Sequence, residues 1–220
     1  MFHKDSRGFY QVDDWDGFEW LDHGFGTRHA LPPGGPARLA TLKQVHSAMC
    51  VAARGRTGVL GQGDALSENT PGALVAVKTA DCLPILLVDP VARAVAAVHA
   101  GWRGTVARVA AGAVAAMAAE FGTEPGNLRA AIGPGIGKCC FEVGPEVAAE
   151  FEEPVSGEGR RAHIDLAAAN RRQLVEAGVT ASAIAASNLC TMCRANEFES
   201  FRRDREKAGR MFSFAALGAL

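Results

Sequence analysis

The sequence predicts one domain in which strands and helices alternate around a mixed β-sheet. Short apolar runs typical of strands alternate with segments whose apolar residues recur at three- and four-residue steps. Two of these runs, 83–88 and 94–98, are separated by a turn at Asp89-Pro90, which predicts antiparallel pairing. A length of 220 residues is consistent with a single domain and a single substantial core.

The first half of the chain is predicted to consist mainly of strands. The Gly/Pro cluster at 31–36 predicts a turn or mobile loop before them. The expected strands are 39–45 and 49–53, on either side of His46, followed by 73–78, 83–88 and 94–98. The order of these runs favours a mixed sheet over a purely parallel one, because 83–88 and 94–98 pair antiparallel.

Helices become prominent in the second half. Apolar residues predict a helix over 105–121 that ends at Gly122, and Asp165 is a good N-cap for a helix through Glu176. The other expected elements are strands at 128–132, 183–186 and 211–217 and a short helix at 145–151. The polar segment 154–161 interrupts the pattern, but it is too short to indicate a linker between domains.

Composition argues against bulk attraction to nucleic acid or membranes. The chain has 23 basic and 24 acidic residues, so its formal net charge is -1, although a few local Arg could still bind phosphate. The low-charge stretch 109–119 is too short to span a bilayer, and the N-terminus has no apolar signal-peptide core. We therefore expect a cytoplasmic protein, whose six cysteines stay reduced rather than forming a disulfide scaffold.

Three residues at predicted strand ends could share a metal ion. His46 closes one strand, Cys82 opens another and His99 ends a third, so a sheet could bring all three to a common rim. Two His and one Cys suit zinc, and three protein ligands with one open position are typical of a catalytic site. Two alternatives stay open: the residues are unrelated, or Cys82 is a nucleophile activated by His46 or His99 and oriented by Asp81.

An anion site is predicted directly after His99. Gly101 and Gly104 allow close backbone approach, and the N–H groups near Thr105 begin the predicted helix. The Arg103 guanidinium adds donors suited to phosphate or carboxylate. The alternative is an ordinary strand-to-helix turn that carries a surface Arg.

The remaining cysteines and loops give weaker signals. C-T-M-C at 190–193 is a single pair, and Cys139-Cys140 is adjacent rather than spaced, so neither a zinc ribbon nor a redox site is strongly indicated. Cys50 is expected in the core. G-P-G-I-G at 133–137 lacks the dinucleotide-binding spacing and predicts a loop lining a pocket. The charged segment 201–207 is expected to be solvated, although Arg202 or Arg203 could turn inward.

Several short motifs occur in a fixed order along the chain. They are H-G-F-G-T-R (23–28), K-Q-V-H-S (43–47), G-D-A-L (63–66), T-A-D-C-L-P (79–84), V-H-A-G-W-R-G-T (98–105), A-I-G-P-G-I-G (131–137), S-F-R-R-D (200–204) and G-R-M (209–211). Taken together, these motifs resemble the laccase-domain family, which includes multicopper polyphenol oxidase-like, purine nucleoside phosphorylase and peptidoglycan editing factor proteins. The resemblance covers the chain from about residue 23 to its end and leaves 1–22 as an N-terminal extension of the single domain. Gly26 departs from the Ser that is commoner in the family, and P-P-G-G-P at 32–36 replaces a longer loop.

The resemblance implies a fold and a metal site. The implied fold is α+β, a single domain of mixed β-sheets covered by helices. The family's ligands map onto His46, Cys82 and His99, which would bind zinc or copper. The name laccase carries little weight, because multicopper oxidation needs several coppers and many more histidine ligands than the six His of this chain.

The resemblance also implies a small-molecule substrate. The expected activity is phosphorolysis of adenosine, inosine, guanosine or methylthioadenosine, with deamination of adenosine. We assign proton transfer to Asp81, and substrate or phosphate contacts to Arg28, Gln44, Arg103 and Arg203. One alternative is an amidase that removes L-serine from a UDP-muramyl precursor, and another is a non-enzymatic metal- or nucleotide-binding module. The oligomeric state is left open.

Overall fold

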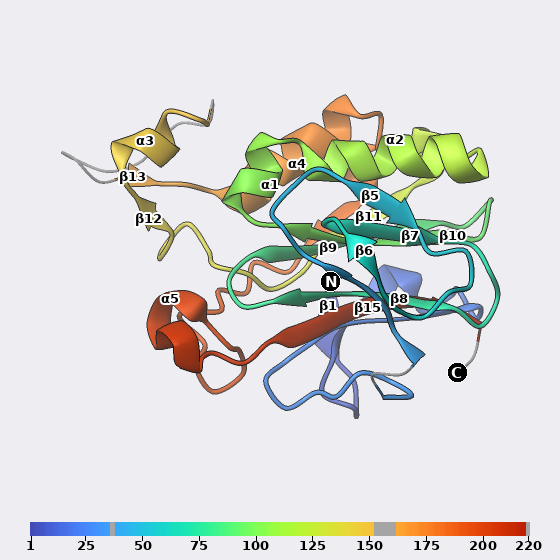
Figure 1. Ribbon diagram of the computed structural model, residues 1–220, viewed down its shortest axis with the longest axis horizontal. Coiled ribbons are helices and arrows are strands. Elements are labelled where there is room, and N and C mark those ends of the chain that lie inside the picture. Colours follow the sequence, from blue (N-terminus) through green and yellow to red (C-terminus); the bar gives the residue numbers. More distant parts are fainter. Residues whose placement is uncertain (36–37, 152–161, 219–220) are drawn as a thin grey trace.

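The computed structural model describes residues 1–35, 38–151 and 162–218 of the chain. Figure 1 shows three layers: helices α1 (Trp102–Val106), α2 (Val109–Phe121) and α4 (Leu166–Glu176) cover one sheet, and a second sheet lies beneath it. This is the expected α+β architecture of mixed sheets and helices. The 154–161 segment lies outside the described residues.

The sheet next to the helices has six strands and mixed pairing. Its order is β14 (Ile184–Ala186), β11 (Arg129–Ile132), β9 (Leu83–Asp89), β10 (Ala94–Ala100), β7 (Ala65–Glu68) and β5 (Cys50–Ala52). The central pair β9 and β10 is antiparallel, with His99 opposite Pro84. The pairs β11–β14 and β5–β7 are parallel, so the prediction of a mixed sheet is confirmed.

The second sheet has seven strands and includes the start of the chain. Its order is β1 (Phe2–Lys4), β2 (Tyr10–Val12), β3 (Leu21–Phe25), β15 (Met211–Leu217), β8 (Leu74–Thr79), β4 (Ala40–Lys43) and β6 (Gly58–Gln62). Residues 1–22, expected as an extension, therefore contribute β1, β2 and the first residues of β3 to this sheet.

Strand β9 explains why the central apolar runs are continuous rather than alternating. Leu83, Ile85 and Leu87 pack with the helices, whereas Leu86 and Val88 pack against the seven-stranded sheet. Both faces are therefore buried, and each buried Leu or Ile stabilises the fold by about 1.5–3 kcal/mol relative to exposure. This central strand gives rigid support to the residues at its end.

The predicted helix over 105–121 is divided in two. Arg108 adopts a left-handed conformation with φ of 62° between α1 and α2, which interrupts the helical backbone. Helix α4 begins as predicted, since the Asp165 carboxylate accepts a hydrogen bond from the Ala168 N–H at 2.9 Å.

The remaining elements lie beside the sheets. Helix α3 (Pro145–Ala148) is shorter than predicted, and β12 (Glu142–Val143) pairs with β13 (Ala162–His163). Helix α5 (Phe201–Asp204) precedes β15. Among the helices of the described ranges, none is long and apolar enough to cross a membrane.

Candidate functional site

The three residues predicted as metal ligands lie at or near the ends of strands from both sheets and come close together. His46 lies in the loop after β4 of the seven-stranded sheet, Cys82 directly precedes β9, and His99 is near the end of β10. One ligand atom from each lies within 4.8 Å of the other two. The structure therefore brings together residues that are 36 and 17 positions apart in the chain.

Close backbone approach makes room for this triad. A Cβ atom at position 101 would lie 2.7 Å from Cys82 Sγ and 3.2 Å from His46 Nδ1, so glycine is required there for packing. The two imidazole rings lie edge to face, with centroids 5.0 Å apart and an interplanar angle of 60°. A thiolate and two imidazoles at this spacing suit a single zinc or similar ion.

Asp64 orients two of the three ligands. Its side chain is fully buried, and its carboxylate oxygen Oδ1 lies 2.9 Å from His99 Nδ1. It also accepts hydrogen bonds from the backbone N–H groups of His46 and Ser47 at 3.0 and 2.6 Å. This arrangement leaves His99 Nε2 for a metal, as in carboxylate–histidine–metal sites.

No role for Asp64 was predicted from the sequence, although it belongs to the G-D-A-L motif. The available signal was a carboxylate directly before the short segment Ala65–Glu68, which forms the buried strand β7. A charged group buried there needs partners, because an unpaired buried carboxylate is very costly. Its main side-chain partner, His99, is 35 residues away, so the sequence alone could not identify it.

The electrostatics of the two histidines differ. Burial acts to lower the pKa of His99, but hydrogen bonds with Asp64 and Cys82 outweigh it and raise this pKa to about 9. Burial and the charge of His99 lower the pKa of His46. The Asp64 carboxyl has a strongly lowered pKa: burial alone would raise it, but its donors from His99 and Ser47 stabilise the charged form.

Asp81 lies beside the triad and is held on both sides. Its backbone is left-handed, with φ of 87°. One carboxylate oxygen accepts from the Thr191 hydroxyl at 2.7 Å, and the other accepts from the Arg202 backbone N–H at 2.6 Å. Its carbonyl accepts from the Ile136 N–H at 2.7 Å. These contacts favour a role in positioning the loops around Cys82.

The triad opens into a cavity of about 590 Å³. Apolar and aromatic side chains form part of the wall, and cationic groups surround it. The cavity is lined by Leu42, Lys43, Gln44, His46, Lys78, Ala80, Asp81, Cys82, His99, Trp102, Arg103, Ile136, Phe141, Phe201, Arg202 and Arg210. Ile136 belongs to the 133–137 loop that was predicted to line a pocket.

The four residues predicted to contact substrate occupy different places. Arg103 lines the cavity, with its guanidinium 4.2 Å from the ring centroid of Trp102. Gln44 also lines it, but both ends of its amide pair with the backbone of Lys78. Arg28 and Arg203 line a separate hollow beside Glu199 and Asp204, and the structure does not bring them to the triad.

A second group of possible metal ligands was not predicted as a site. Cys139, Cys140, Cys190 and Cys193 present sulfur atoms within 4.8 Å of one another. The sequence showed one spaced pair and one adjacent pair, and only the folding of two loops places them together. Cys50 is a lone, half-buried thiol in β5.

The sequence matches a known family over most of its length. The family described as multi-copper polyphenol oxidoreductase laccase matches residues 28–218. The chain belongs to this family. The resemblance read from the motifs is thereby confirmed.

Proteins that are similar in sequence to this chain include named enzymes. A purine nucleoside phosphorylase from Deinococcus radiodurans is 42% identical over 183 residues, which cover 81% of this chain and 70% of that protein. Adenosine deaminase RL5, from an unknown prokaryotic organism, is 44% identical over 162 residues, which cover 68% of this chain and 60% of that protein. The matched part thus spans 70% and 60% of these two relatives.

Solved structures share the whole fold. The hypothetical protein YfiH from Bacillus licheniformis aligns with a TM-score of 0.88 and 28% identity over 98% of both chains. YlmD from Geobacillus stearothermophilus aligns with a TM-score of 0.87 and 29% identity over 99% of both chains. The arrangement of the two sheets is therefore shared with these two solved structures.

Proposed function

We propose that this laccase-family protein is a metal-dependent purine nucleoside phosphorylase that also deaminates adenosine. The observation that carries the proposal is the triad of His46, Cys82 and His99 at a cavity lined by cations and aromatic rings. The names of the relatives from Deinococcus radiodurans and of RL5 support both activities. The substrate is accordingly a small molecule.

Zinc is the metal we propose, with copper as an alternative that the same ligands could bind. His46, Cys82 and His99 would hold the ion, and the donor set of two imidazoles and one thiolate fits it. When bound, zinc lowers the pKa of a coordinated water to about 7 and polarises an acceptor atom of the substrate. Asp64 holds His99 in the orientation that this binding requires.

The cavity offers surfaces for both substrates of phosphorolysis, the purine nucleoside and phosphate. Trp102, Phe141 and Phe201 offer flat surfaces against which a purine could pack. Arg103 and Lys78 lie on the same cavity and could bind phosphate. Phosphate oxygen would attack C1′ of the ribose as the bond to the purine nitrogen breaks, and the purine would take up a proton.

Asp81 was predicted to transfer this proton, and it stays a candidate because it lines the cavity. Its two carboxylate oxygens already accept hydrogen bonds from Thr191 and Arg202, which supports a positioning role more strongly. Asp81→Asn separates the two roles. A proton carrier would change the pH profile of turnover, whereas a positioning residue would lower activity equally across pH.

The activity is tested with matched cysteine variants. Cys82→Ala should abolish the phosphate-dependent release of ribose 1-phosphate from inosine, because the triad loses its thiolate. Cys50→Ala removes a half-buried thiol away from the cavity and should retain turnover. Unchanged turnover in Cys82→Ala would overturn the proposed role of the triad.

The same protein preparation distinguishes the amidase alternative. Release of L-serine from a UDP-muramyl-L-serine substrate should be far slower than nucleoside turnover at equal enzyme concentration. The opposite ranking would assign the site to peptidoglycan editing. Inactivity of metal-replete protein on both substrates would instead favour a binding module.

We also propose a cytoplasmic location. All six cysteines are unpaired in the structure, and four of them, Cys139, Cys140, Cys190 and Cys193, lie close together as free thiols. A reducing compartment maintains thiols in this state. Fractionation of the native host, followed by immunodetection, tests this location.

A further inference from the structure

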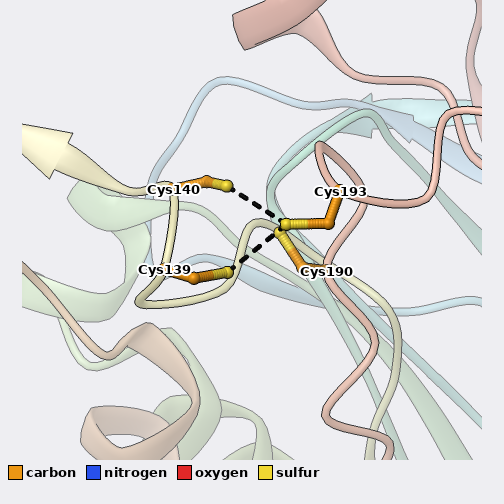
Figure 2. Close-up of side chains that lie close together, drawn as sticks. All are labelled: Cys139, Cys140, Cys190 and Cys193. Carbon is orange, nitrogen blue, oxygen red and sulfur yellow. Dashed lines mark hydrogen bonds between the residues drawn. The ribbon is translucent and has the colours of Figure 1, made fainter.

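Four cysteine side chains converge where two loops cross, outside the cavity described above. Cys139 and Cys140 follow β11 in one loop, and Cys190 and Cys193 follow β14 in the other. Figure 2 shows the two pairs pointing toward each other across the gap between the loops. The Sγ atom of Cys193 lies 3.6 Å from that of Cys139 and 3.3 Å from that of Cys140.

This spacing matches the coordination of one ion by four sulfurs. Zinc–sulfur bonds of about 2.3 Å in a tetrahedron place the sulfurs about 3.8 Å apart. The four sulfurs here all lie within 4.8 Å of one another. A disulfide would bring only two sulfurs together, at about 2.05 Å.

We propose that Cys139, Cys140, Cys190 and Cys193 form a second metal site, which binds one zinc ion as a closed four-thiolate centre. Soft thiolate ligands in a tetrahedral arrangement select zinc or iron among the common metals. Four protein ligands leave no open coordination position, so the site is structural. The proposal depends on the geometry of these two loops and is independent of the proposed function.

The backbone around the cluster is shaped to fit the sulfurs. The Gly137 N–H donates a hydrogen bond to Cys190 Sγ at 3.3 Å, as donors around metal-bound thiolates do. A Cβ atom at position 137 would lie 3.2 Å from Cys190 Cβ and 3.3 Å from Cys139 Sγ. Glycine at position 137 therefore lets the loop that carries Cys139 and Cys140 pack closely against Cys190 of the other loop.

The cluster joins the two loops that support Asp81. The loops already pair weakly: the Gly135 N–H donates to the Leu189 carbonyl at 3.2 Å, and the Thr191 N–H donates to the Gly135 carbonyl at 3.0 Å. Thr191, which lies between Cys190 and Cys193, donates its hydroxyl to Asp81. The bound ion would therefore stabilise the two loops that hold Asp81, the residue that precedes Cys82 in the cavity wall.

Metal content of the purified full chain tests the proposal. Zinc-replete protein, prepared with a reductant, should contain two ions per chain by mass spectrometry. Cys193→Ser should contain one, and Cys82→Ser should also contain one. Cys50→Ser is the matched control and should contain two, because this thiol belongs to neither group.

Cobalt identifies which thiols hold the ion without altering the cluster. In the Cys82→Ser background, reduced metal-free protein titrated with Co²⁺ should develop the intense thiolate-to-cobalt absorption of a tetrahedral four-sulfur site at one equivalent. The double variant Cys82→Ser/Cys193→Ser should lose that spectrum.

Two results would overturn the proposal. One is a Cys82→Ser protein that is folded by circular dichroism and binds no Co²⁺ or zinc at one equivalent. The other is a disulfide among the four cysteines, found by non-reducing mass spectrometry in protein purified without oxygen. The second result would assign the cluster to thiol–disulfide chemistry.

Discussion

Asp81 connects the triad with the four-cysteine cluster, because it precedes Cys82 in the chain and accepts a hydrogen bond from Thr191, which lies between Cys190 and Cys193. The two sites differ in what holds their ligands. The triad draws on both sheets, and the buried Asp64 carboxylate orients His99 and the His46 loop. The cluster draws its four sulfurs from two loops, and Cys139 and Cys193 are exposed. We infer that the triad is preorganised by the fold, whereas the loops of the cluster depend on the ion for their order.

The largest effect is expected from Gly101→Ala, which tests preorganisation of the triad. The added Cβ would lie 2.7 Å from Cys82 Sγ, so that ligand must move. Removal of a residue that hydrogen-bonds a metal ligand typically lowers metal affinity or activity by about 10–100-fold. We expect Gly101→Ala to lower the metal affinity of the triad and the nucleoside turnover by more than this. Metal analysis and activity assays measure both.

The control is Gly17→Ala, because a Cβ atom at that position meets nothing within 4 Å. It should retain both ions and full turnover. Normal zinc content at the triad in Gly101→Ala would show that the site is more adaptable than the structure indicates.

The next effect is expected from Asp64→Asn, which removes the charge behind His99 while keeping the size of the side chain. We expect metal affinity of the triad to fall by about 10–100-fold, with the cluster ion unaffected. Competition with a zinc chelator measures both affinities. Asp89→Asn is the control, since Asp89 is equally buried but accepts from Val91 and Ala92 at the end of β9.

An equal loss of affinity in the two variants would mean that Asp64 acts only through general stability. The inference that Asp64 preorganises the triad would then be wrong.

Thr191→Val tests the connection between the two sites. It removes the hydroxyl that donates to Asp81 at 2.7 Å and leaves a buried carboxylate oxygen without this donor. We expect the free energy of unfolding to fall by about 2 kcal/mol, as for a hydrogen bond to a charged group. Turnover should also decline, because Asp81 supports the loop that carries Cys82.

Thr123→Val is the matched control for this variant. Thr123 is also buried, and its hydroxyl has no hydrogen-bond partner within the described part of the chain. Denaturant unfolding measures the free energy of unfolding of both variants. This free energy should change little in Thr123→Val. Equal stability of the two variants would contradict a coupling through Thr191.

The smallest effect is expected from Gly137→Ala, the counterpart of Gly101→Ala at the cluster. The added Cβ would lie at 3.2 Å or more from its neighbours, so shifts of a few tenths of an ångström can relieve the contact. We expect weaker zinc binding at the cluster, a thermal midpoint a few degrees lower, and unchanged metal content at the triad. A larger loss here than in Gly101→Ala would reverse the comparison.

Much of the central fold was predictable because apolar runs there are long and clearly bounded. Strand β15 spans the predicted residues 211–217, and Asp165 caps α4 as expected. The short strands β1, β2 and β6 were missed, because three to five residues are too few to carry a clear periodic signal. The break at Arg108 was missed because a left-handed residue leaves no mark in the apolar pattern.

The sequence by itself determined the fold class, the family and the residue types of the triad. Those features depend on local apolar runs and on motifs that are contiguous in the chain. Only the tertiary structure decided the partners: it paired Asp64 with His99 across 35 residues and Cys140 with Cys193 across 53. It also placed Arg28 and Arg203 away from the cavity. Such pairings depend on how the two sheets pack and how the loops at their ends cross, which no short stretch of sequence specifies.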